Sequence, residues 1–139
     1  MELVRHRVFS FAQESTRYCN YSKDKFGNEL TFIIPSWYTG KDVTGTGKLI
    51  SAENDKEVIF QSSIKENERN YMELLSIGCT PQQARQILPN ALKTEINMCG
   101  FVSDWKHFFA LRDDKAAHPD MINLAKPLHE EFIARGFIK

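Results

Sequence analysis

The chain has 139 residues, 42% of them apolar and 12% aromatic, and its 18 Lys and Arg balance 18 Asp and Glu to a formal net charge of zero. This length favours one domain with its own core, and the neutral charge excludes the broad basic surface that non-specific nucleic-acid binding needs. The apolar runs are far shorter than the roughly 20 residues that span a bilayer and no signal-peptide pattern is present, so we expect a cytoplasmic protein without a membrane partner.

The first third of the chain is predicted to be extended or irregular. Leu3 to Tyr18 mixes β-branched and aromatic residues with polar ones, which favours one or two strands. A further apolar strand is expected at Leu30 to Ile34, after a turn that contains Gly27. Tyr38 to Ile50 is a glycine-containing loop, and because loops of this length in compact domains are often functional lids or disordered, it is a candidate for mobility.

Two helices are predicted in the middle of the chain. Asp55 to Ser76 carries apolar residues on a helical period with charges between them, and Gly78 follows as a stop signal. Thr80 begins a short helix with a proline in its first turn, the position that proline favours. Pro89 must end this helix, because the residue before a proline avoids the helical region.

The C-terminal part is predicted to be mainly helical. Asn90 to Cys99 is expected to be extended, and helices are expected at Ser103 to Arg112 and Pro119 to Arg135, with Gly136 closing the last one. The apolar stripe predicted on the last helix consists of Met121, Leu124, Ala125, Leu128 and Phe132. The fold class is therefore α+β, an antiparallel or mixed sheet flanked by helices with a helical C-terminal half.

Arg5, His6 and Arg7 form the first cluster that could carry chemistry. If this segment is a strand, its period of two sends both guanidinium groups to one face and the imidazole to the other. Two forked guanidinium groups form a clamp for phosphate or carboxylate. Ser15 adds a hydroxyl group and Arg17 adds a third guanidinium group. The alternative is a solvated strand with alternating basic residues.

Two further arginines are candidate ligands for an anion. Arg85 lies in the short helix beside its buried stripe, where it either extends to water or binds a ligand. Arg112 follows Trp105 by seven residues and Phe108 by four, so it lies in line with two aromatic anchors on the expected core face. Arg112 either serves a ligand or forms a structural ion pair with one of the two aspartates that follow it.

The remaining reactive side chains predict no metal site and no hydrolytic site. The four histidines, His6, His107, His118 and His129, are scattered without metal-ligand spacing. Ser15 has no evident catalytic partners. The residues alone therefore indicate a neutral α+β domain with an arginine-lined pocket that suits a phosphorylated small molecule.

The same arginines carry a family resemblance. Arg5-His6-Arg7, followed after seven residues by Ser15-Thr16-Arg17-Tyr18, resembles the signature of the flavin-dependent thymidylate synthases. Ala84 to Pro89 with the later Thr94, and Trp105 to Arg112, resemble later blocks of that family in the same order. The resemblance thus extends over nearly the whole chain.

This resemblance implies a fold like that of these synthases, with residues 1–139 as a single domain corresponding to the C-terminal portion of the family's full-length domain. It implies reductive methylation of deoxyuridine monophosphate (dUMP) to thymidylate (dTMP). Methylenetetrahydrofolate is the implied carbon donor, and FAD, reduced by NADPH, is the implied hydride source. The implied partners are these small molecules and further copies of the chain in a homotetramer with shared active sites, with no nucleic acid and no membrane.

The resemblance also implies roles for individual residues. Arg112 is the implied catalytic residue, which favours ionisation at the uracil N3. Contacts with dUMP are implied for Arg5, Gln13, Glu14, Ser15, Arg17, Arg85 and Arg112. Contacts with FAD are implied for Arg5, His6, Arg7, Gln13, Ser103 and His107. No metal ligand is implied.

Two alternatives stay open at this point. Only four residues precede Arg5, whereas members of the family carry a substantial portion before this segment. The chain is therefore alternatively a truncated or split member that binds dUMP or assembles without independent catalysis. Single-stranded nucleic-acid binding is the other alternative, because basic and aromatic residues interleave near Tyr18, but zero net charge argues against it.

Overall fold

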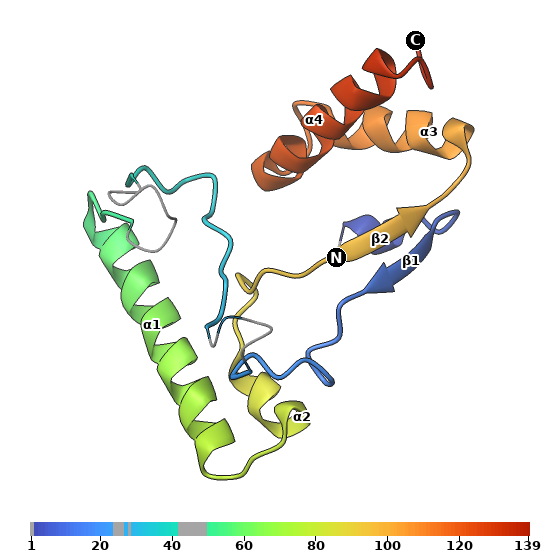
Figure 1. Cartoon of the computed structure of the whole chain (residues 1–139). Coiled ribbons are helices and arrows are strands. Elements are labelled where there is room, and N and C mark those ends of the chain that lie inside the picture. Colours follow the sequence, from blue (N-terminus) through green and yellow to red (C-terminus); the bar gives the residue numbers. More distant parts are fainter. Residues whose placement is uncertain (1, 24–26, 28, 42–49) are drawn as a thin grey trace. The chain divides into compact units, whose positions relative to one another are not determined.

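The computed structural model describes residues 2–23, 27, 29–41 and 50–139. They form two compact units (Figure 1). The terminal unit consists of Met1–Gln13 and Ile96–Lys139, and the central unit of Glu14–Glu95. None of the helices in these described ranges is long and apolar enough to cross a membrane. That residues 1–139 form a single domain remains a prediction.

The terminal unit pairs two strands that are distant in sequence. Strand β1, Ser10–Gln13, runs antiparallel to β2, Ile96–Cys99, with Ser10 opposite Cys99 and Gln13 opposite Ile96. The helices α3, Val102–Arg112, and α4, Pro119–Ala134, follow the second strand. Strands and helices in one chain confirm the α+β class, with an antiparallel sheet.

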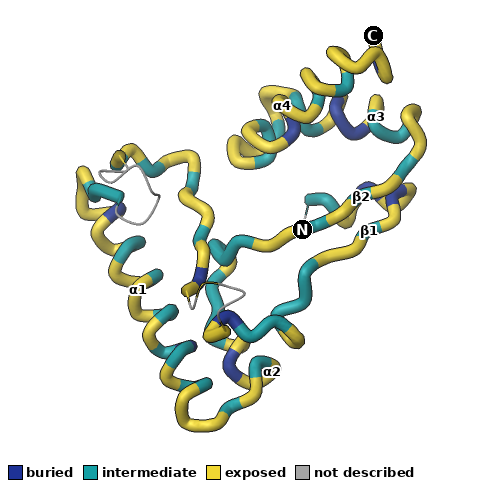
Figure 2. The backbone as a smooth tube through the Cα atoms, viewed as in Figure 1, coloured by how far each residue is buried: buried dark blue, intermediate teal, exposed yellow. Residues whose placement is uncertain are grey.

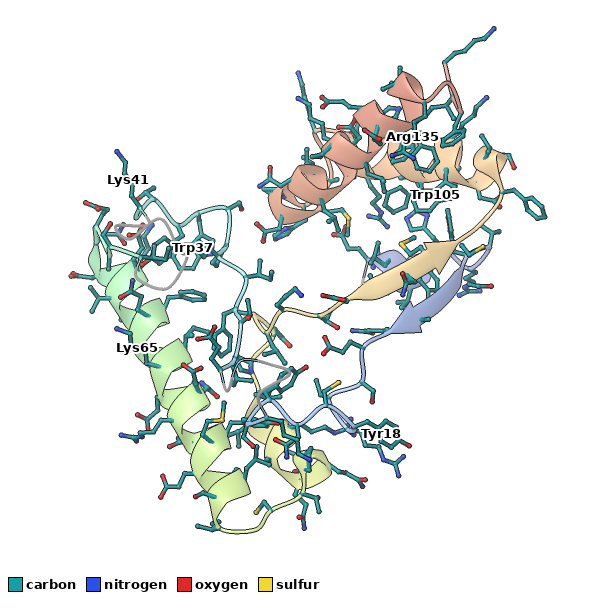
Figure 3. The ribbon with its side chains drawn as sticks, in the orientation of Figure 1. Tyr18, Trp37, Lys41, Lys65, Trp105 and Arg135 are labelled. Atoms are coloured by element: carbon teal, nitrogen blue, oxygen red, sulfur yellow. The ribbon has the colours of Figure 1, made fainter. Side chains whose placement is uncertain are left out.

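The core of the terminal unit is aromatic. Its buried members are Phe9, Phe108, Phe109, Ala125 and Ile138, which Figure 2 colours dark blue. The ring of Trp105, labelled in Figure 3, packs edge-on against Phe9 with the ring centroids 4.8 Å apart. A Cβ atom at Gly100 would lie 2.6 Å from the Phe9 ring, so this close approach requires glycine.

The α3 and α4 helices lie close to their predicted bounds. At the start of α3 the Asp104 carboxylate accepts a hydrogen bond of 3.0 Å from the Phe101 N–H, which satisfies one of the unpaired donors of a helix N-terminus. Helix α4 contains Pro127 and is followed by Gly136, whose φ of 73° belongs to the left-handed region. The predicted bounds of both helices therefore agree with the observed bounds to within about one residue.

The predicted apolar stripe of α4 is only partly buried. Ala125 is fully buried, and Met121 and Phe132 pack against the core. Leu124 and Leu128, in contrast, are 59% and 37% exposed in the single chain. The core of the terminal unit therefore covers a narrower arc of α4 than the predicted apolar stripe spans.

The central unit is built on the long helix α1, Asp55–Ser76, which has the predicted bounds. The side chain of Asn54 accepts a hydrogen bond from the Glu57 N–H, and Gly78 follows with a φ of 97°. The predicted short helix is α2, Pro81–Ala84, continued by a 3₁₀ turn, Arg85–Ile87. Ala84 is fully buried, so packing rather than length stabilises this element.

The predicted strand at Leu30 to Ile34 is reduced to a single bridge. Phe32 pairs antiparallel with Leu92, and hydrogen bonds of 2.8 Å flank this bridge, from the Ile33 N–H to the Ala91 carbonyl and from the Lys93 N–H to the Thr31 carbonyl. Leu30 is instead buried with Tyr21, Tyr71 and Ala84. Tyr38 to Ile50 is the segment with predicted mobility, and its residues 42–49 lie outside the described residues.

The strand predicted over Leu3 to Tyr18 is wrong for most of its length. Leu3–Arg5 is a 3₁₀ turn, and only Ser10–Gln13 is a strand. The His6 N–H donates to the Leu3 carbonyl at 3.0 Å and the Phe9 N–H to the His6 carbonyl at 3.2 Å. These successive turns bury His6 and Phe9, three residues apart, which an alternating strand cannot do.

Candidate arginine site

The terminal unit contains a cavity of about 540 Å³ that gathers most of the predicted cationic residues of this unit. The N-terminal segment and α3 line it. Its lining residues are Arg5, His6, Arg7, Val8, His107, Leu111 and Arg112. We call it the arginine cavity. Five of these seven were candidate site residues, although they come from segments about 100 residues apart in the sequence.

The local turn determines which side chains of the first cluster face solvent. His6 is only 6% exposed, whereas Arg5 and Arg7 are exposed. The expected separation of the imidazole and the two guanidinium groups onto opposite faces required a strand, whereas this segment is a turn and all three residues line the same cavity. Arg5 and Arg7 make no ion pair with any residue in the described part of the chain.

Arg112 is held by three hydrogen bonds. Its Nε donates to His6 Nε2 at 2.9 Å, its Nη1 to Glu2 Oε2 at 3.0 Å and its Nη2 to the Glu2 carbonyl at 3.3 Å. The Arg112 side chain is 12% exposed and that of Glu2 is 34% exposed. Glu2 is therefore the counter-ion of a half-buried guanidinium group.

The predicted alternative partners of Arg112 are wrong. Asp113 accepts no bond from Arg112; its Oδ2 lies 2.7 Å from His129 Nδ1 on α4. Asp114 Oδ1 accepts from the Ala116 N–H at 2.9 Å. Both carboxylates stabilise the loop after α3, whereas Arg112 extends toward the N-terminal segment. The ion pair expected from neighbouring residues is formed instead with a residue 110 positions away.

The bond from Arg112 also fixes the protonation of His6. Because Arg112 Nε is a donor, His6 Nε2 must accept, so the imidazole is neutral with its proton on Nδ1. Burial lowers the pKa of His6 below its ordinary value of 6.5, and the charges of Arg112 and His107 lower it further, while Glu2 raises it. The ring lies against Phe108, with centroids 4.9 Å apart.

Two candidate residues of the central unit, Ser15 and Arg17, are hydrogen-bonded within that unit. The Arg17 Nε donates to Gln82 Oε1 at 2.9 Å, and the guanidinium lies 5.2 Å from the centre of the Tyr18 ring, which Figure 3 labels. The Ser15 hydroxyl accepts from the Arg17 N–H at 3.3 Å. Arg85 is exposed on its 3₁₀ turn.

Three further candidates lie near helix or strand ends. The Glu14 N–H donates to the Glu95 carbonyl at 2.8 Å. Burial, together with the nearby Glu14 carboxylate, raises the pKa of Tyr21 to about 12. Gln13 is exposed at the end of β1, and Ser103 is exposed in the first turn of α3.

A second cavity, of about 590 Å³, belongs to the central unit. Its walls are mainly apolar side chains of residues 29–34 and of α1, with Tyr38 and Ile50. None of the predicted site residues lines it. The concentration of charge in the arginine cavity makes that cavity the candidate site.

Comparison with known proteins decides the family. Residues 1–135 match the model of the thymidylate synthase complementing protein family. The chain belongs to this family.

Curated relatives carry the name flavin-dependent thymidylate synthase. The relative from Pyrococcus furiosus is 31% identical over 99% of this chain and 51% of its own length. The one from Pyrococcus abyssi is 30% identical over 96% and 49%, and the one from Wolinella succinogenes is 30% identical over 93% and 58%. This family member therefore spans about half the length of the first relatives that it matches.

The arginine cavity of this family member has a donor set that fits part of a flavin nucleotide. Arg5 and Arg7 line the cavity. Because their guanidinium groups have no carboxylate partner among the described residues, they can bind phosphate oxygens. Val8 and Leu111 add apolar wall, which suits a ring system. The same donors fit the phosphate of a nucleotide substrate.

Besides the apolar lining residues Val8 and Leu111, Glu2 is a residue at this site of the family member that was not among the sequence candidates. It lies three residues before Arg5, so an acidic residue beside a basic cluster was a visible signal. Its partner, however, is Arg112, which only the folded chain brings near. Sequence spacing indicates pairs within a helix and cannot reveal a pair that depends on tertiary contacts.

Proposed function

We propose that this protein takes part in flavin-dependent synthesis of thymidylate. The reaction is the reductive methylation of dUMP to dTMP, with methylenetetrahydrofolate as the carbon donor and FAD, reduced by NADPH, as the hydride source. The observation that carries this proposal is the arginine cavity, which brings Arg5, Arg7 and Arg112 together around one space. Relatives named flavin-dependent thymidylate synthase support it.

The proposed roles follow from the chemistry of the guanidinium group. It stays charged at any working pH, so it stabilises negative charge without exchanging a proton. Arg5 and Arg7 bind anionic groups in the cavity that they line. Arg112 donates hydrogen bonds to the uracil ring and so favours its ionisation. FAD, when bound, supplies the hydride chemistry.

The other candidates complete the proposed site. Those assigned to dUMP besides Arg5 and Arg112 are Gln13, Glu14, Ser15, Arg17 and Arg85. Those assigned to FAD besides Arg5 and Arg7 are His6, Gln13, Ser103 and His107. We place the protein in the cytoplasm as a homotetramer in which several subunits contribute to each site.

A second candidate function is nucleotide binding without independent catalysis. The observation that favours it is that the chain spans about half the length of the first relatives that it matches. In this case the arginine cavity binds dUMP, and turnover requires groups that another chain supplies. The two functions differ in whether FAD binds and in whether dTMP is formed.

Ligand binding and turnover by the whole chain test the two functions. We expect the purified protein to bind FAD, seen as quenched flavin fluorescence, and to form dTMP from dUMP when NADPH and methylenetetrahydrofolate are present. Arg7→Ala should weaken FAD binding by about tenfold or more, because it removes a charge-assisted contact. Arg135→Ala removes an exposed arginine of the same unit that pairs with Glu131, and this variant should bind FAD like the wild type.

Each outcome of this experiment separates the alternatives. Thermal stabilisation by dUMP without FAD binding would support the nucleotide-binding function. Colourless protein that responds to neither FAD nor dUMP at high concentration would contradict both functions.

A further inference from the structure

The three arginines of the cavity are not electrostatically equivalent. Arg5 and Arg7 are exposed and make no ion pair among the residues that the structure describes. Arg112 has a carboxylate oxygen of Glu2 at 3.0 Å from its Nη1. His6 is neutral, because its Nε2 accepts from Arg112. The positive charge that is available to a ligand is therefore concentrated on Arg5 and Arg7.

Arg112 nevertheless keeps hydrogen-bonding capacity toward the cavity. A guanidinium group has five N–H donors, and His6 and Glu2 use three of them, which leaves two. Arg112 lines the cavity, whereas Glu2 does not. Glu2 therefore neutralises Arg112 from outside the cavity and leaves the space beside its guanidinium open.

The arrangement determines which part of a ligand each arginine prefers. A phosphate group carries between one and two negative charges near neutral pH and is bound most strongly by uncompensated cations. A guanidinium that already holds a carboxylate gains less from a second anion, but it still donates well to an uncharged oxygen.

We propose that Glu2 is a specificity-determining residue of the arginine cavity. Its carboxylate compensates the charge of Arg112, so that a phosphorylated ligand places its phosphate on Arg5 and Arg7 and its less charged ring against Arg112. This inference rests on the proposed function, because it assigns the orientation of a nucleotide in that site. Without the Glu2 charge, Arg112 becomes a third phosphate-binding group.

Binding of inorganic phosphate to whole-chain variants tests the role of Glu2. Glu2→Gln removes the charge but keeps a side-chain oxygen that can accept from Arg112, and the backbone carbonyl of residue 2 still accepts. We expect calorimetry to show phosphate affinity about 3- to 10-fold higher than in the wild type. Glu2→Asp keeps the charge and should restore wild-type affinity. Glu131→Gln, which breaks an exposed ion pair with Arg135, should leave affinity unchanged.

A second variant shows whether the gain passes through Arg112. In the double variant Glu2→Gln with Arg112→Gln the increase should disappear. The proposal is overturned if Glu2→Gln leaves phosphate affinity unchanged, including the case in which neither form binds phosphate. An increase that persists without Arg112 overturns it as well. Melting temperatures of all variants confirm that they are folded.

The same titrations keep this inference distinct from the proposed function. Wild-type binding of dUMP tests the proposed function, and the change caused by Glu2→Gln tests the inference. A phosphate gain in Glu2→Gln without any dUMP binding by the wild type would contradict the proposed function alone. Binding of dUMP by the wild type without the phosphate gain would contradict the inference alone.

Discussion

His6 shows how one buried nitrogen determines the charge balance of the arginine cavity. It is 6% exposed and accepts a hydrogen bond from Arg112. If Nε2 became protonated, this bond would be lost and two cations would face each other in a half-buried place. The sequence indicated a cluster of Arg5, His6 and Arg7, but it could not reveal the bond from Arg112 to His6, which joins residues 106 positions apart.

The lowered pKa of His6 predicts how stability depends on pH. Burial, Arg112 and His107 lower the pKa in the folded chain below 6.5, against the smaller opposing effect of Glu2. The unfolded chain therefore binds this proton first, so the free energy of unfolding falls as pH drops below 6.5 toward the lowered pKa and is unaffected above it. Thermal unfolding from about pH 8 to about pH 5 measures this effect.

A His6→Gln variant identifies the residue responsible. Its melting temperature should depend less on pH over this range than that of the wild type. The exposed His118 is the matched control, and His118→Gln should keep the wild-type dependence. If His6→Gln has an unchanged pH profile, the assigned protonation state is wrong.

Among the elements, helices were predicted more accurately than strands. The bounds of α1 follow from local signals, Asn54 before it and Gly78 after it. The strands β1 and β2 have four residues each and pair across more than 80 positions, so their extents depend on contacts that local patterns do not contain. The turn at Leu3–Arg5 was missed for the same reason, since the burial of His6 and Phe9 determines it.

The start of α1 also contains a buried carboxylate that the sequence analysis did not single out. Glu57 is fully buried. Its Oε1 accepts from the N–H and hydroxyl of Thr39, both at 2.7 Å, and its Oε2 from the Glu53 N–H at 2.7 Å. Burial alone would raise the pKa of Glu57, but these hydrogen bonds and one from Asn54 outweigh it and lower the pKa to about 2.

Glu57 should therefore stabilise the central unit at neutral pH. Its contribution is present above its ordinary pKa of 4.5 and is lost as pH falls from there toward 2. Glu57→Gln replaces one accepting oxygen by an NH₂ group that faces N–H donors, so the melting temperature should fall by about 5 °C or more at pH 7.

An exposed glutamate on the same helix serves as the control. Glu66→Gln breaks an ion pair with Arg69, in which the side chains are 54% and 68% exposed, and alters an exposed hydrogen bond from Asn70, so it should change the melting temperature little. Equal effects of the two substitutions would contradict the structural role of Glu57. The comparison is made by thermal unfolding at pH 7 and again at low pH.

At the scale of the whole molecule, the candidate residues are divided between the two units. Arg5, Arg7 and Arg112 belong to the terminal unit, and Arg17 and Arg85 to the central unit. In the proposed homotetramer, arginines of the terminal unit of one subunit and of the central unit of another can contribute to the same site. The resemblance of the motifs indicated the family, but the division into units is a property of the folded chain.

Mixing of variants tests whether sites are shared. Arg85→Ala and Arg112→Ala should each reduce dTMP formation strongly when purified alone. If the two arginines of one site come from different subunits, mixed oligomers of the two variants contain some complete sites and recover part of the activity. Oligomers of Arg112→Ala mixed with the double variant should recover none. Absence of recovery in confirmed mixed oligomers would contradict shared sites.

The antiparallel pairing of β1 with β2 has a consequence for synthesis of the protein. Gln13 lies opposite Ile96, so the segment between them is closed at its base by the two partners of a single sheet. The ribosome synthesises residues 2–13 and then this intervening segment, while the partners of residues 2–13 are still untranslated. The nascent chain must therefore keep Glu2 and His6 without their partner Arg112 until about 110 further residues have been made, and the anion-binding surface matures only as α3 emerges.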